Sequence, residues 1–177
     1  MSSSREAPAE HPRSSGAPGR RPSSITTLAS LVGAHPDTLR KLFSEGSVAD
    51  PAELGEVTRG LVLSIPVSDE IFLAMRPIVR LISSSGSPWK GKTFDHGGNS
   101  GQNLVFGKLR SRFRAEVAPS AIDGQPALRL LYADPAFGNA WPVRDLVDEL
   151  RGVAPGMAIG PVLHHGRILA WFGLERS

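Results

Sequence analysis

The chain has 177 residues, which is enough for one compact domain with its own hydrophobic core. Because it contains no cysteine, disulfides, thiolate nucleophiles and cysteine-ligated metal centres are excluded, and the cytoplasm is the default expectation for its location. The formal net charge is +3, but residues 1–24 carry four Arg and two Glu, so only +1 remains for the other residues. So small a charge gives no reason to expect a nucleic-acid partner.

Residues 1–24 are rich in Ser, Pro, Gly and Arg and hold almost no bulky apolar side chains, which predicts a disordered basic tail. This tail lacks the apolar segment of a secretory signal. The longest apolar run elsewhere, near residues 61–66, is too short to cross a bilayer, so we expect no membrane partner. Residues 25–177 are expected to form a single domain, with a helical lead followed by a β-barrel.

Three helical patterns open this domain. Residues 25–32 carry apolar side chains at helical spacing. A second helix is expected to begin at the His-Pro-Asp sequence of residues 35–37 and to end at Gly46. Asp50 followed by Pro51 is a typical helix start, since the carboxylate accepts from first-turn amides and proline suits the first helical position. This third helix is expected to last one or two turns.

A strand and a longer helix are expected next. Residues 57–65 are apolar and β-branched, which favours a strand with a possible bulge at Gly60. Residues 68–82 carry a capping pattern and apolar side chains on one face, with Pro77 predicting a kink. Such a helix would plug or cover a sheet.

The remaining residues predict strands joined by short turns, of which residues 123–124, an Asp-Gly pair, form the clearest. The expected strands lie within residues 87–106, 108–117, 125–132, 143–153, 157–164 and 168–174. Short connections imply antiparallel pairing. About seven strands after Gly55 favour a closed or nearly closed barrel, because closure removes exposed sheet edges.

Two short motifs add a family resemblance. The first is a W-x-G-K-x-F segment at residues 89–94, and the second is an aromatic final strand at residues 171–176 that closes with Leu-Glu-Arg. Their order resembles GXWXG proteins, a two-part bacterial family whose second part is a domain of unknown function. Where the name-giving motif would stand, residues 55–60 have one residue too many between the glycines and no Trp.

The resemblance covers residues 39–176 and implies a fold rather than an activity. The predicted fold class is therefore α+β, with N-terminal helices packed on an antiparallel lipocalin-like β-barrel.

Residues 87–106 are the best candidate for one wall of a ligand site, because they combine an indole, two lysines and several glycines. On a regular strand Trp89 would face one way, and Lys90 and Lys92 the other, where they would suit an anionic or carbonyl ligand. Alternatively, the lysines face solvent and Trp89 lies in the core. The glycine-rich residues 97–103 lack phosphate-loop spacing, which favours a loop at the barrel mouth.

The charged residues from 144 to 151 leave two interpretations open. As a strand, they would place Arg144 and Asp148 on one face and Glu149 on the other, so that one set points inward and could act in acid/base chemistry. As a short helix, they would make Arg144 and Asp148 an ordinary exposed pair.

Two other candidates have structural alternatives. His164 and His165 would point to opposite faces of a strand, so we expect no shared metal ion. An inward His164 could carry a proton, or it could be a hydrogen-bonded structural residue. Tyr132 could meet a ligand carbonyl at the barrel mouth or simply close the core.

The sequence thus predicts binding of a small, mainly hydrophobic metabolite inside a barrel, with no cofactor and no metal. The alternative is a cofactor-independent cyclase or isomerase of secondary metabolism that folds its substrate and moves protons. A third possibility is a protein-interaction module that uses the basic tail. The expected ligand-binding residues are Trp89, Lys92, Asn99, Phe113, Arg114, Tyr132, Trp141 and Arg144. The expected proton-transfer residues are Asp148, Glu149 and His164.

Overall fold

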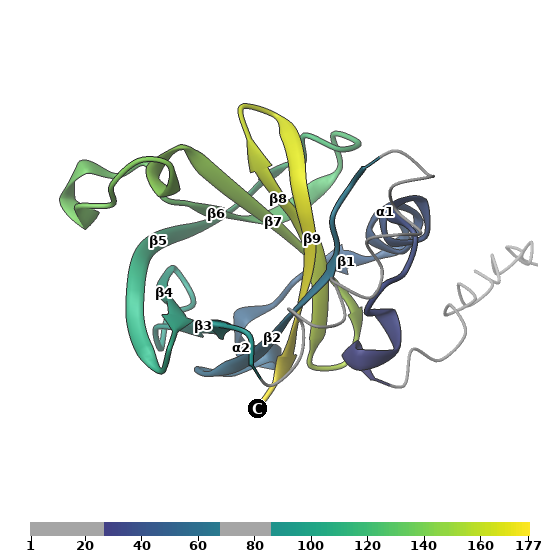
Figure 1. Ribbon diagram of the computed structural model, residues 1–177, viewed down its shortest axis with the longest axis horizontal. Helices are drawn as coiled ribbons and strands as arrows, with labels where there is room; N and C mark the ends of the chain where they lie inside the picture. The colour runs from purple at the N-terminus through teal and green to yellow at the C-terminus, as the bar shows by residue number, and fades with distance from the viewer. Residues whose placement is uncertain (1–26, 68–85) are drawn as a thin grey trace, which may run out of the picture.

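The computed structural model describes residues 27–67 and 86–177, which form a mainly antiparallel sheet closed into a nearly complete barrel (Figure 1). The predicted tail at residues 1–24 and the predicted helix at residues 68–82 lie outside the described residues. The elements are η1 (Leu28–Leu31), α1 (Pro36–Glu45), β1 (Ser47–Val48), α2 (Pro51–Leu54), β2 (Thr58–Ser64), β3 (Trp89–Phe94), β4 (Ser100–Val105), β5 (Lys108–Pro119), β6 (Pro126–Leu131), η2 (Pro135–Phe137), η3 (Val143–Asp145), β7 (Leu146–Ala154), β8 (Met157–His164) and β9 (Arg167–Arg176).

The barrel strands follow the order β2-β9-β8-β7-β6-β5-β4-β3, and every neighbouring pair is antiparallel. From β3 onward, successive strands pair with each other, as the short connections predict. The short strand β1 pairs with β7 outside this path. The prediction of a closed or nearly closed antiparallel barrel is therefore confirmed.

The barrel closes where β2 meets β3, and few backbone contacts make this junction. Val57 and Thr93 form an isolated bridge, and the amide of Phe94 donates to the carbonyl of Glu56 at 2.9 Å. The buried Thr58 adds two bonds through its hydroxyl. It donates to the Lys92 carbonyl at 2.9 Å and accepts from the Lys92 amide at 3.1 Å. A threonine side chain thus holds the backbone of β3 against β2.

Two glycines permit this close approach. Gly91 has φ +144°, and a Cβ there would overlap the backbone carbonyl of Thr58. Gly60 faces the same region, where a Cβ would overlap the indole of Trp89. The predicted bulge at Gly60 is wrong, because Gly60 pairs regularly with Leu174 and the irregularity of β2 falls between Val62 and Ser64. Gly60 is small to make room for the indole.

The helices match the sequence patterns where they are described. Helix α1 begins after His35, whose Nδ1 accepts from the Asp37 amide at 3.3 Å, and it ends before Gly46. Helix α2 begins after Asp50, which accepts from the Ala52 amide at 2.8 Å. The described part of the first predicted helix is shorter than expected and forms only the 3-10 turn η1. Within residues 27–67 and 86–177, no helix is long and apolar enough to cross a membrane.

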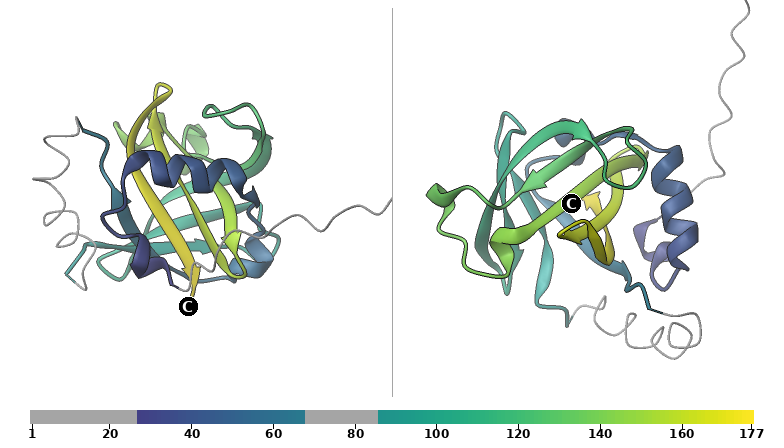
Figure 2. Two further views of the ribbon diagram at one scale, coloured as in Figure 1. Left: turned by 90° about the vertical axis from the view of Figure 1, so that its right-hand side faces the viewer. Right: turned by 90° about the horizontal axis from the view of Figure 1, so that it is seen from above.

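Apolar side chains form two cores, one inside the barrel and one outside it. Helix α1 crosses the outer face of the sheet and contacts β7 and β8 (Figure 2). There Phe43 packs edge-on against Trp171 with ring centroids 5.8 Å apart. On the same outer face, the buried Arg151 donates to Asp123 at 2.7 and 2.8 Å and to the Phe43 carbonyl at 3.2 Å. The outer face of β7 is therefore covered as completely as its inner face.

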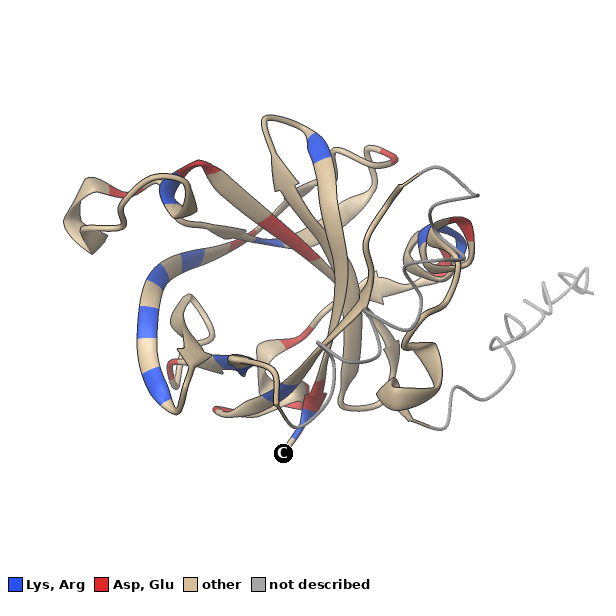
Figure 3. Cartoon of the chain, in the orientation of Figure 1, with Lys and Arg blue, Asp and Glu red and all other residues tan. Residues whose placement is uncertain are grey.

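Strand β5 carries a row of basic residues, which appear as blue segments along the cartoon (Figure 3). The exposed members are Lys108, Arg110, Arg112 and Arg114. This row is the polar face of a half-buried strand, since Phe113 and Ala115 point into the barrel core.

Candidate functional site

The barrel contains an open pocket of about 290 Å³, which lies at the small end of the range of ligand pockets. Its walls are largely apolar. The lining residues are Val62, Trp89, Lys92, Asn103, Val105, Ser111, Tyr132, Val143, Leu146, Asp148, Val162, Ala170 and Phe172. The barrel is therefore hollow beside Trp89, as the binding hypothesis requires.

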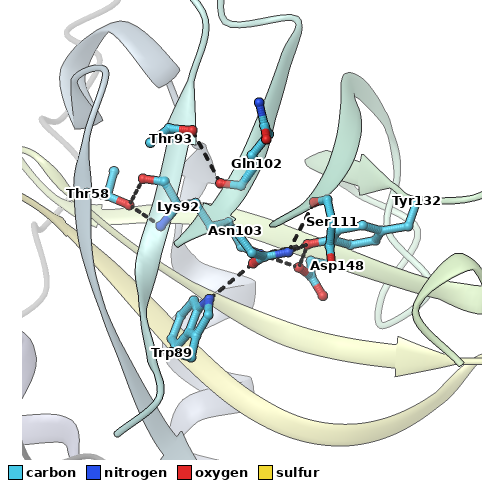
Figure 4. Close-up of polar contacts among 9 residues, drawn as sticks. All are labelled: Thr58, Trp89, Lys92, Thr93, Gln102, Asn103, Ser111, Tyr132 and Asp148. Carbon is cyan, nitrogen blue, oxygen red and sulfur yellow. Dashed lines mark hydrogen bonds and ion pairs between the residues drawn. The ribbon is translucent and has the colours of Figure 1, made fainter. Parts of the chain in front are cut away.

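Three polar side chains of the pocket, Asn103, Tyr132 and Asp148, form one hydrogen-bonded group around Lys92 (Figure 4). Lys92 is only 2% exposed, and its ammonium donates to three acceptors. These are Asn103 Oδ1 at 2.7 Å, Tyr132 OH at 2.7 Å and Asp148 Oδ2 at 2.8 Å. We call these four residues, together with Trp89, the Lys92 cluster.

Further hydrogen bonds connect the other members of the cluster. The Tyr132 hydroxyl donates to Asp148 Oδ2 at 2.7 Å and accepts from Asn103 Nδ2 at 3.1 Å. Trp89 Nε1 donates to Asn103 Oδ1 at 3.1 Å. Asn103 Nδ2 also lies 3.4 Å from the carbonyl of Ser111. The amide orientation of Asn103 is thus determined by two donors that bond to Oδ1 and two acceptors that face Nδ2.

The members come from strands that are far apart in the sequence. Trp89 and Lys92 lie on β3, Asn103 on β4 and Asp148 on β7, while Tyr132 directly follows β6. The expectation that Trp89 and Lys92 face opposite ways is wrong. A register shift between positions 89 and 91 makes Lys90 an extra residue, so that both side chains reach the same pocket.

Aromatic rings surround the Lys92 ammonium. Its Nζ lies 5.2 Å from the ring centroid of Phe172, 5.4 Å from Phe113, 5.5 Å from Tyr132 and 5.6 Å from Trp89. Ring faces attract cations, and this attraction grows when water is absent. The positive charge is therefore balanced by one carboxylate and by these rings.

Burial shifts the proton affinities of the cluster. Loss of water lowers the pKa of Lys92 from its ordinary value, while the charge and hydrogen bond of Asp148 act in the opposite direction. Burial also raises the pKa of Tyr132 well above its usual value, and the neighbouring Asp148 raises it further. Lysine, phenol and carboxylate thus lie within 2.7–2.8 Å of one another, in a place where proton transfer among them is geometrically direct.

Four of the residues nominated from the sequence meet at this pocket, namely Trp89, Lys92, Tyr132 and Asp148. Phe113 lies behind them, fully buried and with its ring centroid 5.7 Å from that of Tyr132. The strand interpretation of residues 144–151 is confirmed from Leu146 onward, with Asp148 on the inner face of β7. It is wrong for Arg144 and Asp145, which lie in the 3-10 turn η3.

The other nominated ligand residues lie elsewhere. Asn99 is exposed in the turn between β3 and β4, where its backbone N–H donates to Asp95 Oδ1 at 2.9 Å. Arg114 is exposed and pairs with Glu116 at 2.9 Å. Trp141 is 69% exposed, and Arg144 is exposed beside Asp145. Among the described residues that line the pocket, none of these four appears.

Glu149 lies on the outer face of β7, where it is completely buried. It accepts hydrogen bonds from the Ser120 hydroxyl and from the Ala121 amide, the latter at 2.9 Å, and Arg129 lies 3.5 Å away. These contacts attach the connection between β5 and β6 to the barrel wall. The position of Glu149 separates it from the pocket by the thickness of the sheet.

His164 ends strand β8 beside the turn to β9. The expectation that His164 and His165 point to opposite faces is wrong, because His165 has φ +49° and its ring lies 4.2 Å from that of His164. Together with Asp145 they offer three metal-ligating atoms within 4.8 Å of one another. The strand argument against a shared metal ion therefore does not apply to this pair.

Sequence reasoning missed Asn103 and Ser111. Asn103 belongs to the glycine-rich stretch expected to be a loop, yet β4 begins at Ser100. Ser111 is the extra residue of a second register shift, opposite positions 102 and 103. This shift leaves no mark in the alternation of apolar residues, so no local signal could have found Ser111.

No family model and no curated protein matches the chain. The chain is similar to a solved structure described as a protein from Thermomonospora curvata, with 16% sequence identity and a TM-score of 0.47. The match covers 85% of this chain and 93% of the other chain. The resemblance to GXWXG proteins therefore stays a prediction.

Proposed function

We propose that this protein binds a small, mainly hydrophobic molecule in the barrel pocket, with a polar end of the ligand at the Lys92 cluster. The observation that carries the proposal is a fully buried Lys92–Asp148 ion pair on the wall of a largely apolar pocket. Such a pair is a poor source of stability, because well-packed apolar residues of similar volume often stabilise a protein equally well or better. Ligand recognition gives a reason for its presence. The barrel would then act as a lipocalin-like container.

The test is saturable binding that depends on the pocket. Native mass spectrometry of freshly purified protein should reveal a co-purifying small molecule. Titration with that molecule should quench part of the tryptophan fluorescence, since Trp89 lines the pocket. Ala170→Phe would fill the pocket, since Ala170 lines it. Leu169→Phe is the matched control, because Leu169 is the preceding residue of β9 and is 48% exposed. Equal binding by both variants would contradict the proposal.

A second candidate function is a cofactor-independent cyclase or isomerase. The observation that favours it is the contact of Asp148, Tyr132 and Lys92 at 2.7–2.8 Å on the wall of the pocket. On this proposal Asp148 moves the proton, and Tyr132 and Lys92 hold the developing charge. Incubation with polyketide-like and terpenoid-like compounds separates the two functions. Saturable retention without product would count against the enzyme.

A further inference from the structure

Lys92 differs from every other lysine of the chain in its surroundings. The sequence contains four lysines, and all of them lie in described residues. Lys41 and Lys108 are exposed and Lys90 is half-buried, whereas Lys92 is buried and lines a pocket. A desolvated lysine beside a proton acceptor is the usual setting of a nucleophilic amine.

The hydrogen bonds of Lys92 limit what it can offer to a ligand. Its three ammonium protons already point to Asn103, Tyr132 and Asp148. A ligand oxygen would have to displace one of these acceptors to receive a hydrogen bond from Nζ. A carbonyl carbon does not compete with these acceptors, because it binds the nitrogen lone pair rather than a proton. Nζ gains that lone pair when one proton leaves.

From these contacts we propose that the pocket takes up an aldehyde or ketone and holds it as an imine on Lys92. This inference rests on the proposed binding function and specifies the class of its ligand.

The steps balance within the cluster. The ammonium of Lys92 gives one proton to Asp148, 2.8 Å away, and the neutral amine adds to the carbonyl carbon. The new carbinolamine oxygen takes up the second proton that Nζ loses, passed on through the Tyr132 hydroxyl. The protonated Asp148 then returns its proton as the hydroxyl departs. The products are one water and an iminium cation, and the carboxylate is restored.

The site fits the charge of this product. The iminium nitrogen would carry the same positive charge as the ammonium that it replaces, beside the same carboxylate. The rings of Phe172, Phe113 and Trp89 already lie 5.2–5.6 Å from that nitrogen. The burial that lowers the pKa of Lys92 increases the share of neutral amine at neutral pH.

The experiment uses the full chain, cinnamaldehyde as the probe and cyanoborohydride to reduce the imine. Intact mass should rise once by the mass of the aldehyde less one oxygen atom, and peptide mapping should place the adduct on Lys92. The rate at Lys92 is expected to exceed that at Lys41 or Lys108 by at least about tenfold. Modification spread evenly over the lysines would overturn the inference.

Two variants make the result specific. Lys92→Met combined with Asp148→Asn removes both charges together, and it should abolish the rapid adduct. Lys108→Met is the control, because Lys108 is exposed on β5 and should leave the adduct unchanged. Circular dichroism confirms that each variant is folded.

Cinnamyl alcohol separates this inference from the function on which it rests, since it has nearly the same shape but no carbonyl. Saturable binding of both compounds, with no adduct from the aldehyde, overturns the imine and leaves the binding function standing. Failure of both compounds to bind, with no adduct, counts against both.

Discussion

Replacing Lys92 by Met is expected to destabilise the protein strongly. Lys92 is 2% exposed and Asp148 is 3% exposed, so the variant leaves a carboxylate in the pocket without its counter-charge. It also removes three hydrogen bonds of 2.7–2.8 Å. Breaking a buried pair in this way typically costs about 3–5 kcal/mol. That is a large part of the total stability of a domain, about 5–15 kcal/mol.

The double variant Lys92→Met/Asp148→Leu distinguishes loss of the pair from loss of packing. It removes both charges at similar volume, so most of the lost stability should return and the coupling energy should be at least about 2 kcal/mol. Urea unfolding at pH 7, followed by circular dichroism, measures all variants. Lys41→Met is the control, since the exposed Lys41 pairs with Glu45 only at 4.0 Å and should change stability by less than about 0.5 kcal/mol. A cost below about 1 kcal/mol for Lys92→Met would refute the picture of a dry, buried pair.

Tyr132 is the only tyrosine of the chain, so the change in ultraviolet absorbance on ionisation of a phenol reports Tyr132 alone. Its raised pKa predicts no phenolate near pH 10 in the folded state, whereas the tyrosine of the unfolded chain should ionise there. The free energy of unfolding should therefore fall as pH rises above about 10, and Tyr132→Phe should remove that dependence. Gly91→Ala should lower stability by about 1–3 kcal/mol or more in thermal unfolding, because φ +144° strains any side chain and a Cβ would overlap Thr58. Glu149→Gln should lower stability by about 1–3 kcal/mol yet change ligand affinity by less than about twofold, whereas Asp148→Asn should weaken binding. An equal loss of binding in both would contradict their placement on opposite faces of β7.

Local chemistry was sufficient to predict most of the elements. Asp50 and Pro51 start a helix through their own backbone geometry, and the residues at 123–124 form a tight turn in which Gly124 has φ +72°. The strands were found because alternating residues face the inner core and the outside. Closure into a barrel also followed, since so many short antiparallel strands would otherwise leave exposed edges.

The site could be predicted only in part, because its geometry depends on strand register. One extra residue at Lys90 reverses the facing of Trp89 relative to Lys92, and nothing in the neighbouring residues indicates it. Sequence alternation also cannot tell which faces are covered. Glu149 and Arg151 are as buried as Asp148, because α1 and the β5–β6 connection lie over the outer face of β7.

Thr58 links closure of the barrel to placement of Lys92, because its hydroxyl bonds both to the amide and to the carbonyl of Lys92. Thr58→Val keeps the shape of the side chain but removes both bonds, which should cost about 1–3 kcal/mol and let β3 move away from β2. Ligand affinity should then fall by at least about threefold, because Nζ would lose its alignment with Asp148. Thr93→Val is the matched control on β3, where the hydroxyl makes only a 3.4 Å contact with Gln102. If Thr58→Val lowered stability but left affinity unchanged, the junction would hold the fold together without positioning the lysine.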